Sequence, residues 1–481
     1  MKKKSLGINA ILNAIKTALS VIFPLITFPY ASRVLGVDNI GIFNFSSSVV
    51  SYTALFAALG VKTYAVREGA RFRENREQLN TFASEVFTIN LYATIVAYIV
   101  LFLLCISIPK LFFYRPFIFV LSWEIVFTTI GCDWVYPIFE NYFYVTVRLL
   151  CVYIISMILL FTFVKSDQDL MKYTMISSFV ACGSYAVNII GRHKLCKIRF
   201  TFKCNFRKHL IPILSFFMNA VTTTIYVHSD VLILGFMTSD TFSGIYAVSA
   251  RIYSIIKQVL AAVITVSVPR LSSYWGTGQK KAAEETCHYI FNALLVLAAP
   301  AMVGLLCLSK QVILLISGEA YEAASTSLAI LSIALIFSLF CWFYVSCVLI
   351  PSKHENEVLQ GTVAAAVTNI VLNLLLIPYW QERAAALTTC IAEAVALAVT
   401  YYRSINIMRI KTNIRDILSV IIGCVSIVMI CKTTILITNF NTLLTLAIAI
   451  PFSAITYGII LIIAKNSTVF FLLKKLKKKH D

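Results

Sequence analysis

Long apolar stretches alternate with short polar connections along the whole chain. Most stretches run for roughly 20 residues or more, which lets a helix cross a bilayer core about 30 Å thick. The predicted spans are fourteen, at roughly 7–30, 40–61, 83–108, 116–138, 146–164, 173–191, 211–237, 242–269, 286–309, 326–350, 358–379, 384–404, 416–437 and 441–464. We find no segments of about 10 residues with the alternating polarity of membrane β-strands. The pattern predicts an all-α polytopic membrane protein with about 14 transmembrane helices.

Composition and charge agree with a membrane location. The chain has 59% hydrophobic and 13% charged residues with a mean hydropathy of +0.84, outside the range of soluble domains. Its net charge of +19 is concentrated in connections that lie on one side when the Met1 end is placed inside. The segment "GRHKLCKIRFTFKCNFRKHL" (191–210) contains no acidic residue, and we interpret it as a topology signal lying on anionic lipid headgroups. We therefore expect both termini in the cytoplasm and no nucleic-acid partner.

The sequence gives little indication of a metal site, a cofactor site or a catalytic site. Most of the 13 cysteines fall inside predicted spans, where cysteine behaves as a small hydrophobe. Cys196 and Cys204 have a spacing that fits no zinc pattern, and the histidines are scattered. No connection is long enough to fold as a separate domain, as an enzyme that builds polysaccharide would need. We expect no metal, no cofactor, no catalytic residue and no enzymatic activity.

An internal repeat relates the two halves of the chain. Residues 41–67 align without gaps to residues 244–270, with six identities that include Gly41/Gly244 and Arg67/Arg270. The alignment equates span 2 with span 8, and this offset of six spans, an even number, preserves the orientation. We expect two pseudo-symmetric six-helix lobes, an architecture in which transporters handle substrate between the lobes. The predicted parts are an N-terminal six-helix lobe (1–191), a basic cytoplasmic linker (192–210), a C-terminal six-helix lobe (211–405), and helices 13 and 14 with a basic cytoplasmic tail (406–481).

The segment "RVLGVDNIGIFNFSSSVVSYTALFAALGVKTYAVREGARFRENRE" (33–77) resembles the N-terminal signature of bacterial polysaccharide flippases, which handle O-antigen or capsule repeat units. The "RVLG" opening and the "YAVREGAR" end are its most specific parts. These flippases share a superfamily with multidrug exporters of the MATE type and with lipid II flippases. The resemblance implies a carrier that moves undecaprenyl-diphosphate-linked oligosaccharide from the inner to the outer leaflet of the bacterial cytoplasmic membrane. It implies as partners the polyprenyl-diphosphate-linked glycan, membrane lipids and other polysaccharide assembly proteins.

Lys16, Arg251 and Lys257 lie inside predicted spans, where an unpaired charge costs about 2.5–3.5 kcal/mol on insertion scales. A lipid diphosphate is an anion that such cations can hold, so all three are candidate substrate-binding residues. In the lipid II flippases that the chain resembles, cations on spans 1, 2 and 8 line the cavity. Lys16 and Arg251 fit that pattern, whereas we find no cation on span 2. The alternative for Arg251 is a structural pair with Asp230 on span 7.

Four acidic residues also fall inside predicted spans. Asp230 and Glu393 are candidates for ion coupling or for structural ion pairs, and Glu124 is a third candidate. Glu124 and Asp133 are nine residues apart, which on an unbroken helix puts them on opposite faces and keeps them from lining one pathway. We place Asp133 at the membrane interface.

The predicted function is a flippase that works by alternating access. One alternative is a cation-coupled multidrug antiporter of the same superfamily, which would need acids in its cavity. A second is a membrane polysaccharide polymerase or ligase, which would need a large outer loop. The glycan, the coupling ion or other energy source and the oligomeric state do not follow from these residues.

Overall fold

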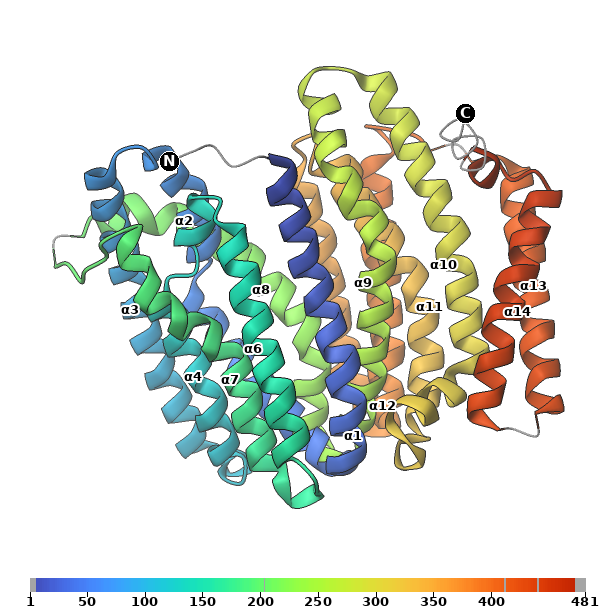
Figure 1. The fold of residues 1–481 in the computed structure, drawn as a ribbon, viewed down its shortest axis with the longest axis horizontal. Coiled ribbons are helices and arrows are strands. Elements are labelled where there is room, and N and C mark those ends of the chain that lie inside the picture. Colours follow the sequence, from blue (N-terminus) through green and yellow to red (C-terminus); the bar gives the residue numbers. More distant parts are fainter. Residues whose placement is uncertain (1–5, 203, 411, 439–440, 472–481) are drawn as a thin grey trace. The chain divides into compact units, whose positions relative to one another are not determined.

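The computed structural model describes residues 6–202, 204–410, 412–438 and 441–471, and the regular elements in these ranges are all helical (Figure 1). Contacts divide the chain into two compact units, Met1–Gly244 (unit 1) and Ile245–Asp481 (unit 2). This division follows packing, whereas the lobes were drawn from the repeat, so the lobe boundary near 192–210 stays a prediction. The basic tail predicted at the C-terminus lies, from residue 472 on, outside the described residues.

Unit 1 is built from eight helices and the start of a ninth. They are α1 (Leu6–Ala58), α2 (Val61–Gly69), α3 (Arg76–Ser107), α4 (Arg115–Gly131), α5 (Val135–Ile138), α6 (Tyr142–Phe163), α7 (Leu170–Gly191) and α8 (Phe206–Met237). Helix α9 (Asp240–Gly276) begins in unit 1 and continues into unit 2. Short 3-10 turns lie at Ala70–Phe72, Pro109–Phe112, Asp167–Asp169 and Arg192–Lys194. Helix α1 packs on α3, α4, α6 and α8, and α4 packs on α7, which makes α1 the central element of this unit.

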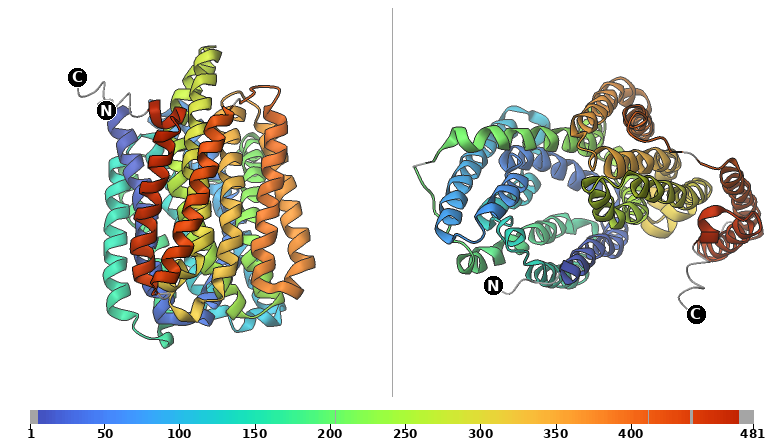
Figure 2. Two further views of the ribbon diagram at one scale, coloured as in Figure 1. Left: turned by 90° about the vertical axis from the view of Figure 1, so that its right-hand side faces the viewer. Right: turned by 90° about the horizontal axis from the view of Figure 1, so that it is seen from above.

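Unit 2 contains the rest of α9 and five further helices. They are α10 (Lys280–Ser317), α11 (Ala324–Phe343), α12 (Glu355–Ser404), α13 (Ile414–Ile437) and α14 (Thr442–Ile463). A 3-10 turn, Glu319–Tyr321, precedes α11, and a π-helical segment, Tyr344–Leu349, follows it. Helices α13 and α14 lie side by side and pack on α10 (Figures 1 and 2).

The prediction of a polytopic helical membrane protein is confirmed. Eleven helical segments of the described chain are long and apolar enough to cross a membrane. Two of them, Ile15–Phe72 with 58 residues and Glu355–Ser404 with 50 residues, are far longer than a single crossing needs. Each holds a break, at Gly36 and at Gln381, so each supplies two membrane-length halves. The predicted count of fourteen is reached if both halves cross and if α8, with 32 residues, crosses as well.

The break in α1 permits a close helix crossing just beyond it. Gly36 has φ of 79°, a conformation that glycine adopts without steric cost. After the break, Gly41 lies so close to α9 that an added methyl group would overlap the backbone oxygen of Asp240. In the same way, a methyl group on Gly244 would overlap the backbone oxygen of Val37. The two contacts are equivalent under the repeat, because Gly244 is the counterpart of Gly41 and Val37 is the counterpart of Asp240 at the offset of 203. Local two-fold symmetry requires such a pair of contacts.

A hydrogen bond at this crossing obeys the same symmetry. Thr241 donates from Oγ1 to Asp38 Oδ1 at 2.6 Å, and the two residues are 203 positions apart. Residues that the repeat alignment equates therefore meet in space. This geometry supports the alignment independently of its six identities.

Candidate functional site

The reversal after α4 places a buried carboxylate at the centre of a polar cluster in unit 1. Cys132 has a left-handed backbone (φ 45°, ψ 51°), which ends α4 before the short helix α5 begins. Asp133 follows and is 8% exposed, so it is buried inside the protein, and its predicted place at the membrane interface stays a prediction. Its Oδ1 accepts a hydrogen bond from Arg148 Nη2 of α6 at 2.9 Å, and its Oδ2 accepts one from Lys62 Nζ of α2 at 3.2 Å. The burial of this acid is therefore compensated by two charge-assisted hydrogen bonds.

Helix α7 completes the cluster through Asn188. The Asn188 side chain donates from Nδ2 to Asp133 Oδ1 at 3.1 Å and accepts a hydrogen bond from Arg148 Nη1. The Arg148 guanidinium also lies 5.7 Å from the centre of the Tyr136 ring. The cluster thus joins α2, the α4–α5 reversal, α6 and α7, and it fixes the direction of each charged group.

Lys16 of α1 belongs to the same charged environment. It is half-buried, and the charged groups that act on its ammonium are those of Lys62, Asp133 and Arg148. Lys16 makes no ion pair with any residue that the structure describes. Three cations, Lys16, Lys62 and Arg148, therefore act on one another and on Asp133, and they outnumber the nearby acids even when Glu124 is counted as ionised.

A cavity of about 140 Å³ lies beside the cluster. Lys62, Asp133 and Glu124 all line it, together with Asn90 of α3 and Tyr185 of α7. The prediction that Glu124 and Asp133 cannot line one pathway is therefore wrong. It assumed an unbroken helix, whereas the left-handed residue before Asp133 turns the chain and brings both carboxylates to the same space.

Sequence reasoning missed Lys62 and Arg148. Lys62 follows directly after predicted span 2, and Arg148 is the third residue of predicted span 5, so both looked like interfacial residues. The structure places them around Asp133. Predicted span 2 contains no cation, but Lys62 lies directly after it, as the second residue of α2.

In unit 2, Lys257 of α9 is paired with Glu393 of α12. The distance between Lys257 Nζ and Glu393 Oε1 is 2.8 Å, and Tyr253 donates its hydroxyl to the same oxygen at 3.1 Å. The Glu393 side chain is only 5% exposed, whereas that of Lys257 is 30% exposed. The carboxylate is therefore the more deeply buried member of the pair.

Arg251 and Asp230 differ in their surroundings. Arg251 is an exposed residue of α9 in unit 2, and Asp230 is a residue of α8 in unit 1 with 4% exposure. The predicted pair between them stays a prediction. Within the described ranges, no group of three or more His, Cys, Asp or Glu side chains is placed to hold a metal ion.

Comparisons with known proteins place these features in a family. Residues 6–275 match the model of a family described as "Polysaccharide biosynthesis protein". A protein named "Putative O-antigen transporter" from Escherichia coli (strain K12) is 24% identical over 412 residues, which covers 82% of this chain and 96% of that protein. A protein of the same name from Shigella dysenteriae is 23% identical over 387 residues, covering 77% of this chain and 93% of its own length.

Among solved structures, the fold matches one titled "Lipid II flippase MurJ, inward closed conformation". The TM-score is 0.75 at 16% sequence identity, and the match covers 94% of this chain and 99% of that one. At this identity the likeness establishes the fold.

Proposed function

The chain belongs to the polysaccharide biosynthesis protein family, and from this premise we propose that it flips undecaprenyl-diphosphate-linked oligosaccharide repeat units across the bacterial cytoplasmic membrane. The family model covers more than half of the chain, and the relatives are named as a transporter and a flippase. The protein is a multi-pass membrane transporter and not an enzyme. The lipid-linked substrate, the direction from inner to outer leaflet and the alternating-access mechanism are the proposal.

The observation that carries the proposal is the excess of positive charge around Asp133 in unit 1, where Lys16 lies inside predicted span 1. Lys16, Lys62 and Arg148 surround Asp133, and Lys16 has no acidic partner among the described residues. Keeping an unneutralised cation in a low-dielectric environment is costly, and such residues usually serve a ligand or pathway. A diphosphate supplies the missing negative charge, and both ammonium and guanidinium groups bind phosphate oxygens well.

The substrate also explains why a polar interior is needed. Each sugar hydroxyl that enters hydrocarbon without a hydrogen-bond partner costs on the order of 1–3 kcal/mol, so a glycan of several sugars does not cross unaided. A hydrated, cationic path lets the sugars and the diphosphate move together while the polyprenyl chain stays in lipid. The distribution of basic residues predicts that both termini are cytoplasmic, and the outward direction of transport is part of the proposal.

A leaflet assay in proteoliposomes tests the proposal. Purified protein is reconstituted with a fluorescent polyprenyl-diphosphate-linked oligosaccharide, and the fraction accessible to an external quencher is followed over time. We expect translocation by the wild type and a strong reduction in the Lys16→Ala variant and in the combined Arg251→Ala/Lys257→Ala variant. Lys172→Ala is the matched control, because Lys172 is an exposed residue in the first turn of α7 that pairs with Asp169.

The outcomes separate function from site. Failure of the wild-type protein to translocate any such glycan would refute the proposed function. Translocation at the wild-type rate by both cation variants would refute the assignment of these residues while leaving the function in place.

A further inference from the structure

The segment between α7 and α8 is bound along α3 as an extended strap, defined here as residues 196–202. Three of its backbone N–H groups, two residues apart, donate to side-chain oxygens of α3 that are four residues apart. The pairs are Lys197 N to Asn80 Oδ1 (2.8 Å), Arg199 N to Ser84 Oγ (3.1 Å) and Thr201 N to Thr88 Oγ1 (3.1 Å). The spacings match because two extended residues span about 6.6 Å and four helical residues rise about 6 Å.

This pairing fixes which side chains of the strap face outward. Successive side chains of an extended segment point to opposite sides. Cys196 and Ile198 are buried in the apolar core of unit 1, and Lys197 and Arg199 are exposed. The strap therefore presents its cations in a defined direction, which a free linker would not do.

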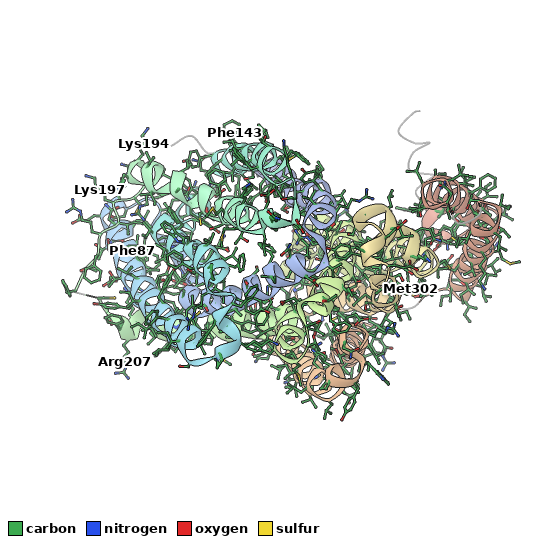
Figure 3. All side chains as sticks on the ribbon, turned by 90° about the horizontal axis from the view of Figure 1, so that it is seen from below. Phe87, Phe143, Lys194, Lys197, Arg207 and Met302 are labelled. Carbon is green, nitrogen blue, oxygen red and sulfur yellow. The ribbon has the colours of Figure 1, made fainter. Side chains whose placement is uncertain are left out.

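Cations and aromatic rings are both exposed on the strap and next to its ends, with the rings of Phe200 and Phe202 in the alternate register to Lys197 and Arg199. Among the described residues, the cations Lys194, Lys197, Arg199, Arg207 and Lys208 are exposed and make no ion pair. In Figure 3, the labelled side chains of Lys194, Lys197 and Arg207 lie along the outer rim of unit 1. Phe202 is 87% exposed, and its ring stands 4.8 Å from that of Phe200, which neighbours Tyr92 of α3.

We propose that the strap is a binding site for the headgroups of anionic phospholipids. Its cations attract phosphate and glycerol-phosphate groups, while the exposed ring of Phe202 inserts at the boundary between headgroups and acyl chains. The hydrogen bonds to α3 hold the cations in place before a lipid arrives, which lowers the entropic cost of binding. The inference concerns the linker and does not depend on which molecule the protein transports.

Chemistry favours a lipid over a soluble acidic partner. The cations could bind a free acidic peptide or a nucleic acid. Neither partner, however, would explain why Phe202 is almost fully exposed. The strap also adjoins the membrane-length helices α3 and α8, so bilayer headgroups are its nearest source of anions. A topology signal alone requires positive charge but no ordered backbone.

Native mass spectrometry of the detergent-purified full chain tests this site with phosphatidylglycerol and phosphatidylcholine. The strap variant is Lys194→Gln/Lys197→Gln/Arg199→Gln/Arg207→Gln, which removes two cations of the strap and one cation on either side of it in the sequence. The matched control is Lys280→Gln/Lys281→Gln/Lys353→Gln/Arg403→Gln, which removes the same charge from exposed positions elsewhere. We expect the wild type to prefer phosphatidylglycerol and the strap variant to lose about fivefold in binding for each cation removed. The control should keep the wild-type preference.

A second variant and a second measurement cover the case in which the fourfold substitution fails to fold. Phe202→Ser keeps every charge and should weaken phosphatidylglycerol binding several-fold. Amide exchange of residues 197–201 in nanodiscs should slow in the wild type when phosphatidylglycerol replaces part of the phosphatidylcholine. Equal binding of the two lipids, equal losses in the strap and control variants, or exchange that ignores the lipid would each overturn the proposal.

Discussion

Removing Lys257 and Glu393 separately and together should distinguish a structural ion pair from a ligand-binding cation. The two charged atoms are 2.8 Å apart, so their gross attraction is about 6 kcal/mol at an effective dielectric constant of about 20. Much of this is offset by desolvation, because the carboxylate is only 5% exposed. Lys257→Ala should lower the free energy of unfolding by about 3 kcal/mol, the low end for a broken buried pair, since the lysine side is partly open.

The double variant Lys257→Met/Glu393→Gln should recover most of that stability. It replaces the buried pair with groups that are both uncharged, and such replacements are often neutral for folding. Stability can be measured by reversible unfolding in mixed micelles, and binding by titration with a polyprenyl-diphosphate-linked glycan. If Lys257 holds the diphosphate, both variants lose one charge-assisted hydrogen bond, and binding falls about 10- to 100-fold.

Glu393→Gln alone should change ligand binding in the opposite direction. It leaves Lys257 without its internal counter-charge, so an incoming diphosphate no longer competes with Glu393 Oε1 for the ammonium. Binding should then tighten although the protein is destabilised. Full recovery of transport in the double variant, together with weaker binding in Glu393→Gln, would refute the ligand role and leave the pair purely structural.

Three further predictions follow from the contacts of unit 1. Gly41→Ala should destabilise the protein by about 1–3 kcal/mol in the same unfolding assay, because the new methyl group meets the backbone of α9, whereas Gly458→Ala, with open space around it, should have little effect. Asp133→Asn should cost about 3–5 kcal/mol, because it leaves two cations without their buried counter-charge; an effect below about 1 kcal/mol would contradict the cluster. Burial raises the pKa of Cys196 to about 11, so its thiol should react slowly with iodoacetamide at neutral pH, as peptide mapping can follow. Asn80→Ala should speed that reaction by loosening the strap, and an unchanged rate would contradict the strap's attachment.

The helical class and the membrane location could be predicted because each span signals itself locally, through about 20 apolar residues in a row. The repeat could also be detected in the sequence, and the reciprocal contacts of Gly41 and Gly244 explain why glycine occupies both positions. Lys16 and Lys257 could be singled out because a charge in an apolar stretch is a local anomaly. Their neighbours could not be identified, since the partner of Lys257 is 136 residues away on another helix.

The error about Glu124 and Asp133 has a different origin. The argument from helical angles was correct for a continuous helix, but α4 stops at Gly131. The residue that takes the left-handed conformation is Cys132 and not the glycine before it, so the usual signal for a helix end stood one position away. Lys62 and Arg148 were missed because positions near the ends of spans are normally solvated, and only the fold shows that both reach a buried acid.

The two units handle intramembrane cations differently, and this difference yields a test with ligand alone. In unit 2 the charge of Lys257 is matched by Glu393, whereas in unit 1 the three cations Lys16, Lys62 and Arg148 outnumber the nearby acids Asp133 and Glu124. An anion that binds the folded protein and relieves this excess should stabilise it by RT ln(1 + [L]/Kd), about 2.7 kcal/mol at a hundredfold excess over Kd. Undecaprenyl diphosphate should therefore raise the unfolding temperature, and neutral undecaprenol should not. The increment should shrink in Lys16→Ala, so an equal increment from both lipids, or one untouched by that substitution, would show that the excess charge in unit 1 serves no diphosphate.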